Sequence, residues 1–524
     1  MTVRATLTPE YWGEAFTLTA DDREFLLNLF VEDELPRSTD ALARALMAYR
    51  TQREEAAIRR KQQGQGTLYQ PKRVFQVGEQ VVFPALDFAV GQVAAIRNGQ
   101  NPDYDHFKVI EVELDGARRE FAAEFAYTHR LNEDAAILSP AEEVLSPDEL
   151  YKRYAARFVP HLRRLLHATP DLVWLAGQWF PRALIADVNV GQLNIAEAVL
   201  DMNGGGPLST EAILAEVGLP REINRNLQIF SLNYALYNDE RFDEVGPAGE
   251  VLWYLVRLEP AGVLNPPDRL AYTPQDHARD ALNADLLKVE RRLDDEWSEL
   301  PVADEAADDE EEVTFTLTYP HRRAGTVPLS PTTSRLFPNG RTHRIRFMFE
   351  DARSGQRWPG WVVRERRYAF GLDVWYAAND VPAGAYVQLS RGDEPGVVVV
   401  DLRGLRPRRE WVRVANLRDN RLTFEVAKRQ VPCDYDDQLI VLADDTAGVD
   451  KLTTQLTERA APLADLIQQL LPELAKLSPQ GTVHVKTLYA AVNLVRRTPP
   501  GPLFAALAAQ TTFRALGDGY YLAR

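Results

Sequence analysis

Arginine side chains are concentrated in one stretch of the chain, from Arg341 to Tyr376, where they alternate with β-branched and aromatic residues. A guanidinium group offers a planar fork that binds phosphate or stacks on a base. The window 313–410 contains sixteen arginines, nine carboxylates and no lysine, a net charge of +7 in a chain whose total is −16. This pattern predicts a surface that binds nucleic acid, with DNA expected. An alternative reason for the missing lysines is GC-rich codon usage, because arginine is frequent throughout the chain.

Successive side chains of a strand point to opposite faces. Two arginines share one face in each of the runs RIRFMF and WVVRERRY, and two adjacent strands of this kind would form a basic patch. The candidate nucleic-acid-binding residues of this patch are Arg344, Arg346, Arg364, Arg366 and Arg367. Trp361 and Trp375 lie nearby in sequence and either stack on bases or belong to the core, and we favour the core.

Short strands and tight turns fill residues 313–445, too many for βαβ units, so we expect an open β-barrel there. The order AGTVPLS, LFP, RIRFMFEDARSG, WPGWVVRERRYAFGLDVWY and AYVQLS resembles the DNA-binding pseudobarrel of plant transcription factors and of some restriction enzymes. The resemblance implies that loops and strands beside a concave basic face bind DNA, at the positions of the five arginines above.

Residues 206–262 read as helix, turn, helix and β-hairpin: LSTEAILAEVGL, REINRNLQIFSLNYALYND and RFDEVGPAGEVLWYLVRL. This order resembles the winged helix of the delta subunit of bacterial RNA polymerase. The resemblance implies that the second of these helices enters a major groove with base-reaching residues at its start. Those residues are Arg221, Asn224, Arg225 and Asn226, which are equally well explained as a solvated first turn. The hairpin region carries four acids that suit a phosphate-gripping wing poorly, which leaves docking on a protein open: Asp239, Glu240, Asp243 and Glu244.

The remaining segments complete a multidomain α+β chain. VGEQVVFP and GQVAAI, in 71–135, resemble SH3-like barrels of transcription-associated proteins, or form a generic β-module. Residues 18–62 predict a helical hairpin, used for packing or as part of a helix-turn-helix. Residues 146–202 are predicted to be helical, with basic residues at helical spacing that form either a solvated face or a phosphate contact: Arg153, Arg157, His161 and Arg164. The expected divisions are 1–70 (helical), 71–135 (SH3-like barrel), 146–262 (helical, with a winged helix at 206–262), 263–312 (helix and acidic linker), 313–445 (arginine-rich barrel) and 448–524 (helical, with a second winged helix).

After Arg292, every charged residue up to Glu312 is acidic. Blocks of like charge repel one another and tend to stay disordered. We therefore expect a solubilising linker, and as an alternative a mimic of nucleic acid that competes for the basic barrel.

Several classes of function lack support in the sequence. The single cysteine, Cys433, rules out an intrachain disulfide framework and a cysteine zinc site, and it fits a reducing cytoplasm. We see neither a signal peptide nor an apolar run of about 18 residues, so no membrane association is expected. No phosphate-cradling, metal-protease or serine-nucleophile motif is present, so we expect no cofactor and no enzyme. The alternatives to a nucleic-acid-binding, transcription-associated protein are a scaffold that docks on RNA polymerase or another protein, and a nuclease or reader of modified DNA.

Overall fold

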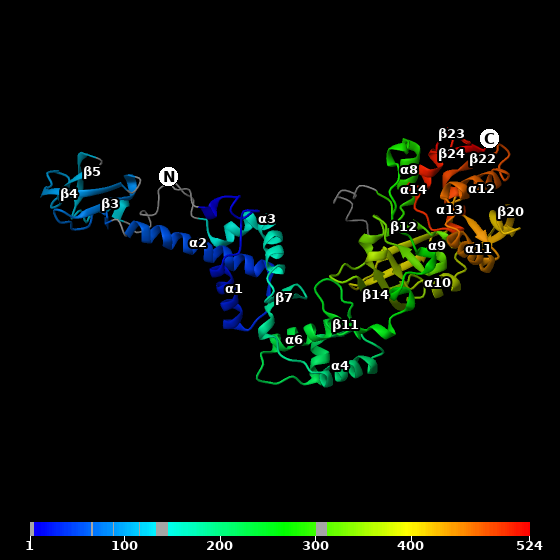
Figure 1. Ribbon diagram of the computed structural model, residues 1–524, viewed down its shortest axis with the longest axis horizontal. Coiled ribbons are helices and arrows are strands. Elements are labelled where there is room, and N and C mark those ends of the chain that lie inside the picture. Colours follow the sequence, from blue (N-terminus) through cyan, green and yellow to red (C-terminus); the bar gives the residue numbers. More distant parts are fainter. Residues whose placement is uncertain are drawn as a thin grey trace. The chain divides into compact units, whose positions relative to one another are not determined.

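The computed structural model describes residues 5–63, 66–86, 89–114, 116–132, 145–299 and 312–523. The protein is a multidomain α+β chain, as the sequence predicted, and contains a strongly curled half-barrel sheet (Figure 1). Its residues divide into two compact units. The first comprises Met1–Asp187 and Pro220–Ser231, and the second Val188–Leu219 and Leu232–Arg524.

The first unit contains three helices and a small sheet in the order β1-β8-β7. The elements are α1 (Ala20–Asp33), β1 (Arg37–Ser38), α2 (Thr39–Gln63), α3 (Pro147–His167), β7 (Leu172–Leu175) and β8 (Gln178–Pro181). Capping boxes at Thr19 and Ser146 begin α1 and α3, because each cap side chain accepts the backbone N–H three residues on. The prediction that 146–202 is helical is confirmed for α3 but wrong for 172–181, which form the hairpin of β7 and β8. Ala176 and Gly177 adopt positive φ angles of 52° and 79°, the geometry of a tight hairpin turn, and this turn joins β7 to β8.

A five-stranded sheet is inserted in the chain between α2 and α3. Its order is β2-β3-β4-β5-β6, with β2 parallel to β3 and the other pairs antiparallel. The strands are β2 (Thr67–Leu68), β3 (Gln80–Phe83), β4 (Ala89–Asn98), β5 (Lys108–Leu114) and β6 (Ala117–Ala123). The sheet has its own apolar core, which includes Tyr69, Val81 and Ile110. A separate β-module was expected in this region.

A similar set of helices, with a three-stranded sheet in the order β10-β11-β9, spans residues 190–255. Pro220–Ser231, which includes the start of its third helix, belongs to the first unit, and the rest belongs to the second. The elements of this set are α4 (Val190–Met202), β9 (Leu208–Ser209), α5 (Thr210–Val217), α6 (Arg225–Tyr237), β10 (Phe242–Glu244) and β11 (Leu252–Leu255). The short helix α7 (Ala261–Leu264) and helix α8 (Ala284–Leu293) follow.

A seven-stranded sheet in the order β12-β17-β18-β14-β15-β16-β13 forms the half-barrel. Only the central pair β14–β18 is parallel. The elements are β12 (Glu312–Thr316), α9 (Tyr319–Ala324), β13 (Thr326–Pro328), β14 (Arg344–Asp351), β15 (Arg357–Val363), β16 (Tyr368–Phe370), α10 (Asp373–Ala378), β17 (Tyr386–Arg391) and β18 (Val397–Leu402). Ile345, Phe347 and Phe349 of β14 point into its core, as the alternation predicted.

The strands after residue 408 do not extend the half-barrel, contrary to the prediction for 313–445. They form a separate sheet in the order β20-β19-β21, because β19 pairs with β20 on one side and with β21 on the other. The strands are β19 (Arg408–Arg418), β20 (Arg421–Val431) and β21 (Val441–Ala443). Part of this sheet shares an apolar core with α8 and the C-terminal helices, through residues such as Leu286, Phe424 and Leu470.

The C-terminal elements repeat an order seen twice before. They are α11 (Thr446–Glu458), α12 (Leu463–Ala475), β22 (Thr482–His484), α13 (Val485–Val495), α14 (Pro500–Ala508), β23 (Phe513–Gly517) and β24 (Tyr520–Ala523), with sheet order β22-β24-β23. In all three copies a helix and a short strand precede two helices and a hairpin, and the last strand lies at the centre of the sheet.

A shared detail relates the first two copies. Trp179 of β8 donates its indole N–H to the buried hydroxyl of Thr39 at 3.0 Å, and Trp253 of β11 donates to the hydroxyl of Thr210 at 3.2 Å. Each threonine is the first residue of the helix that follows the short strand. The sequence predicted two such copies, and the structure adds a third at the N-terminus.

Among the described helices, none combines the length and apolar composition needed to cross a membrane.

Candidate nucleic-acid interface

Arg344 of β14 forms ion pairs with two carboxylates, those of Asp243 in β10 and of Glu259, which follows β11. Its Nη1 lies 2.9 Å from Asp243 Oδ2 and 3.0 Å from Glu259 Oε2, and the Glu259 side chain is fully buried. Burial and the charge of Asp243 raise the pKa of Glu259 to about 8. Burial therefore opposes ionisation of Glu259, and Arg344 offsets this only in part.

Two neighbouring arginines, Arg341 before β14 and Arg346 within it, contact the same hairpin. Arg341 lies 3.2 Å from Glu244 of β10, whose side chain is largely buried. The guanidinium of Arg346 lies over the Tyr254 ring at 5.7 Å, and burial lowers the pKa of Arg346. The two acids that made β10 a poor phosphate-binding wing are therefore partners of arginines from the half-barrel.

Apolar contacts complete this attachment. One cluster combines Val245 and Tyr254 of the hairpin region with Trp361, Val363 and Tyr368 of the half-barrel. Trp361 is 2% exposed and Trp375 is 7% exposed, so both belong to the core, as predicted.

Arg364 and Arg366 do not lie on a strand, and that part of the prediction was wrong. The chain leaves β15 at Val363 and makes a single 3₁₀ turn over Arg364–Arg366 before β16. The turn ends at Arg367, whose φ of 57° is left-handed. A strand over WVVRERRY would need extended backbone throughout, which this reversal prevents.

The three arginines of the turn have separate environments. Arg364 donates to the Gly340 carbonyl and to Asn339 Oδ1, and Arg366 is exposed. Arg367 donates to the Glu296 carbonyl at 2.9 Å and lies over the Trp297 ring at 4.5 Å. The five predicted arginines thus do not form one free basic patch.

The residues predicted at the start of the second-copy helix are exposed. Arg221 and Asn224 precede α6, and Arg225 is its first residue. Asn224 Oδ1 accepts the backbone N–H of Asn226 at 2.9 Å, which caps the helix. No ion pair of Arg221 or Arg225 occurs among the residues that the structure describes. These three residues belong to the first compact unit.

Helix α3 carries a basic face whose importance the sequence did not reveal. Its buried side is formed by residues such as Tyr154, Phe158 and Leu162. On the exposed side it presents Lys152, Arg153, Arg157, Arg163 and Arg164. From Leu150 to His167 the helix has no acidic residue, and within the described chain none of these five cations forms an ion pair.

The signal for α3 was present in the sequence as arginines at helical spacing. What was missing was the hairpin β7–β8, which makes α3 the third helix of a repeated fold. The inserted five-stranded sheet separates α2 from α3 in sequence and hides the pattern. His161, which belongs to the same spacing, instead contacts the Phe16 carbonyl at 2.8 Å.

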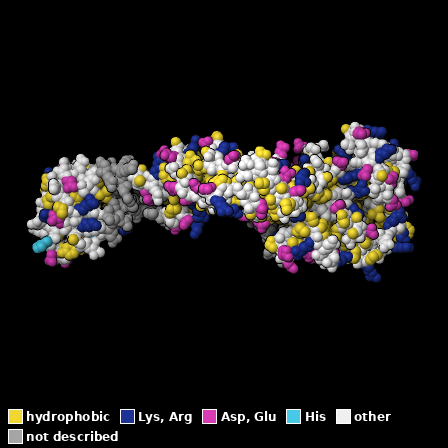
Figure 2. Space-filling model, turned by 90° about the horizontal axis from the view of Figure 1, so that it is seen from below, with side chains coloured by type: hydrophobic (Ala, Val, Ile, Leu, Met, Phe, Trp, Pro, Cys, Tyr) yellow, Lys and Arg dark blue, Asp and Glu magenta, His cyan; other side chains and the backbone are white. Residues whose placement is uncertain are grey.

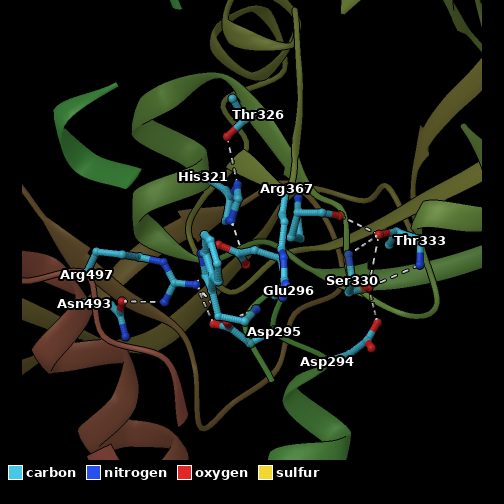
Figure 3. Close-up of polar contacts among 12 residues, drawn as sticks. Asp294, Asp295, Glu296, His321, Thr326, Ser330, Thr333, Arg367, Asn493 and Arg497 are labelled. Atoms are coloured by element: carbon cyan, nitrogen blue, oxygen red, sulfur yellow. Dashed lines mark hydrogen bonds and ion pairs between the residues drawn. The ribbon is translucent and has the colours of Figure 1, made fainter. Parts of the chain in front are cut away.

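A buried charge cluster lies where an acidic linker was expected. Figure 3 shows Arg497 and His321, from different elements, converging on Asp295 and Glu296. Arg497 Nη2 lies 2.8 Å from both oxygens of Asp295 and 2.7 Å from Glu296 Oε1. The hydroxyl of Tyr489 donates to Asp295 at 2.6 Å, and His321 Nε2 lies 3.2 Å from Glu296 Oε2.

The two carboxyl groups of this cluster respond differently to burial. Burial raises the pKa of Asp295, and Arg497 offsets this only in part. Burial also opposes ionisation of Glu296, but Arg497 and His321 outweigh it and lower its pKa. The cluster joins the 294–296 segment to α9 and to the C-terminal helices, so this segment is folded. The rest of the predicted linker, 300–311, lies outside the described residues.

Ion pairing is widespread on the surface as well. On the face drawn in Figure 2, Lys and Arg side chains are interspersed with Asp and Glu. Among the described residues, no group of three or more His, Cys, Asp or Glu side chains is arranged to hold a metal ion. Among the described residues, the five cations of α3 have no ion-pair partner, and they follow one another along a single helix.

No protein-family model, curated protein or solved structure matches this chain.

Proposed function

We propose that this protein binds double-stranded DNA through winged-helix units and acts in transcription or its regulation. Support for the fold comes from the order helix, strand, helix, helix and hairpin, which occurs three times. In a winged helix the third helix lies in the major groove. The observation that carries the proposal is α3, a third helix whose exposed side carries five cations and, after Glu149, no acid.

Helix α3 suits a duplex for electrostatic reasons. Its five cations lie on the side opposite its buried residues, so they can approach a polyanion without unpacking the fold. Each phosphate neutralised releases condensed counterions, which makes binding strongly dependent on salt. Arginine can also read guanine in the groove.

The start of α6 is the second proposed contact. Arg221 and Arg225 supply charge, and Asn224 supplies an amide, although its oxygen is already used in capping.

The half-barrel takes a different role from the one that the pseudobarrel resemblance implies. Arg344 and Arg346 hold the second copy in place, and we propose that they do not contact DNA.

The test is duplex binding by the full chain, measured by fluorescence anisotropy across a salt series. Arg153, Arg163 and Arg164 are changed together to glutamine. The matched control changes Arg23, Arg119 and Arg130, three exposed arginines elsewhere in the first unit, so both variants lose three charges. We expect the α3 variant to bind about 10–100-fold more weakly, with a salt slope smaller by about 2–3, and the control to change little.

Three other results would count against the proposal. If both triple variants weaken binding equally, the effect is one of overall charge and α3 is not the site. If the wild-type chain shows no salt-sensitive binding, the scaffold that docks on RNA polymerase or another protein becomes the better account. Cleavage of DNA that requires a divalent metal would favour the nuclease alternative.

A further inference from the structure

The hairpin of β19 and β20 carries an unusually exposed tryptophan. Trp411 is 64% exposed, whereas Trp361 and Trp375, the two considered from the sequence, are buried. Burying a large aromatic ring stabilises a fold, and an exposed ring does not provide this stabilisation. Its position therefore needs an explanation other than packing.

The side chains around Trp411 are basic. Alternation places Arg409 and Arg413 on the same face of β19, and the register places Lys428 of β20 directly opposite Trp411. The acids of the two strands, Glu410 and Glu425, fall on the other face by the same alternation. Within the described chain no ion pair engages these three cations, although Arg413 also donates to the Asp437 carbonyl at 2.5 Å.

A pocket of about 300 Å³ opens beside the ring. This volume is at the lower end of small-molecule sites, which span about 300–1,000 Å³. Trp411, Arg413 and Val426 form one wall, and Gln438, Ser478 and Tyr520 are among the other lining residues. Asp437 is the one carboxylate among the lining residues, so the pocket combines aromatic surface with amide and hydroxyl groups.

We propose that this face binds single-stranded nucleic acid. One base stacks on Trp411, the flanking phosphates contact Arg409 and Lys428, and a neighbouring base enters the pocket. Single strands are bound by this combination, in which aromatic rings stack on successive bases and cations follow the backbone. The cations flanking the ring favour a polyanion over an apolar partner. This site and the proposed duplex-binding site both bind nucleic acid. They differ in position and in binding a single strand or a duplex.

The test uses the full chain and labelled oligothymidylate of about 12 nucleotides, a length within the usual site size. Trp411→Ala is compared with Trp411→Phe and with Tyr237→Ala, which removes an aromatic ring that is also 64% exposed. Stacking contributes about 1–3 kcal/mol per base, so we expect Trp411→Ala to weaken binding about 5–150-fold. Trp411→Phe keeps most of the affinity, Tyr237→Ala changes it less than about twofold, and duplex binding by Trp411→Ala stays at the wild-type level.

A charge pair gives the second arm of the experiment. The double change Arg409→Gln and Lys428→Gln reduces both the affinity for the oligonucleotide and its salt slope. The control is Arg418→Gln with Arg421→Gln, at the far end of the same hairpin. An oligouridylate of the same length shows whether the site prefers the deoxyribose or the ribose strand.

The proposal fails if the wild-type chain binds neither oligonucleotide, or if Trp411→Ala leaves the affinity unchanged. It also fails if Tyr237→Ala or the far-end pair has the same effect, because the loss is then not specific to this face. If duplex binding is absent but a single strand binds through Trp411, the proposed duplex function fails and this site stands.

Discussion

The arginines of β14 and the cations of α3 have similar sequence signatures and opposite environments. Arg344 and Arg346 are drawn against Asp243, Glu259 and Tyr254 of the second copy. The cations of α3 face away from their own core and have no carboxylate partner among the described residues. A count of charges along the chain favoured the first set, because it could not tell a cation that fastens two parts of the fold from one that is free to bind a ligand.

The largest effect should come from the most deeply engaged arginine, Arg497. Changing Arg497 to methionine leaves Asp295 and Glu296 buried without a cation, and removing one partner of a buried pair costs about 3–5 kcal/mol. We expect the free energy of unfolding, measured by urea denaturation, to fall by about this amount. A loss below about 1 kcal/mol would show that the cluster is open to water or rearranges.

A smaller loss should follow the change of Arg344 to methionine. Glu259 is fully buried, and the change leaves Glu259 and Asp243 without their cation, so we expect a loss of about 1–3 kcal/mol in the free energy of unfolding. Arg366→Met is the control, since Arg366 is exposed on the neighbouring turn, and should change stability by less than about 0.5 kcal/mol. Equal losses of stability for the two variants would show that the ion pairs of Arg344 contribute no more to folding than the exposed Arg366 does.

The pH dependence of stability should reveal Glu259. Its pKa is raised by burial and by Asp243 to about 8, so the folded state binds more protons than the unfolded state between the ordinary value near 4.5 and about 8. The contribution is therefore fully present below pH 4.5 and is lost as the pH rises towards 8. Urea denaturation of wild type and of Glu259→Gln should show a flatter profile over this range for the variant. Parallel profiles would mean that Glu259 does not titrate there.

The smallest effect on stability is expected for α3. The change of Arg153, Arg163 and Arg164 to glutamine removes no ion pair, so the free energy of unfolding should stay within about 0.5 kcal/mol of wild type. The same variant is expected to lose most of its affinity for duplex DNA. A large loss of stability would place these cations with those of β14, as structural groups.

Several elements were predictable from the sequence because their causes are local. The capping boxes at Thr19 and Ser146 involve residues three positions apart, and the burial of Ile345 and Phe347 follows from alternation along one strand. The candidate site was predictable only in part. Arg344 and Arg346 share a face as expected, whereas the turn over 364–366 was missed because RER has no glycine or proline to mark it.

The sequence by itself determined where capped helices such as α1 and α3 begin, which face of β14 is apolar, and that the chain is a multidomain α+β protein. Tertiary structure alone decided which charges are free. Arg344 meets Asp243 about a hundred residues away in sequence, and Arg497 meets Asp295 about two hundred away. Helix capping and strand alternation act over a few residues, whereas ion pairing depends on which distant segments the apolar cores bring together.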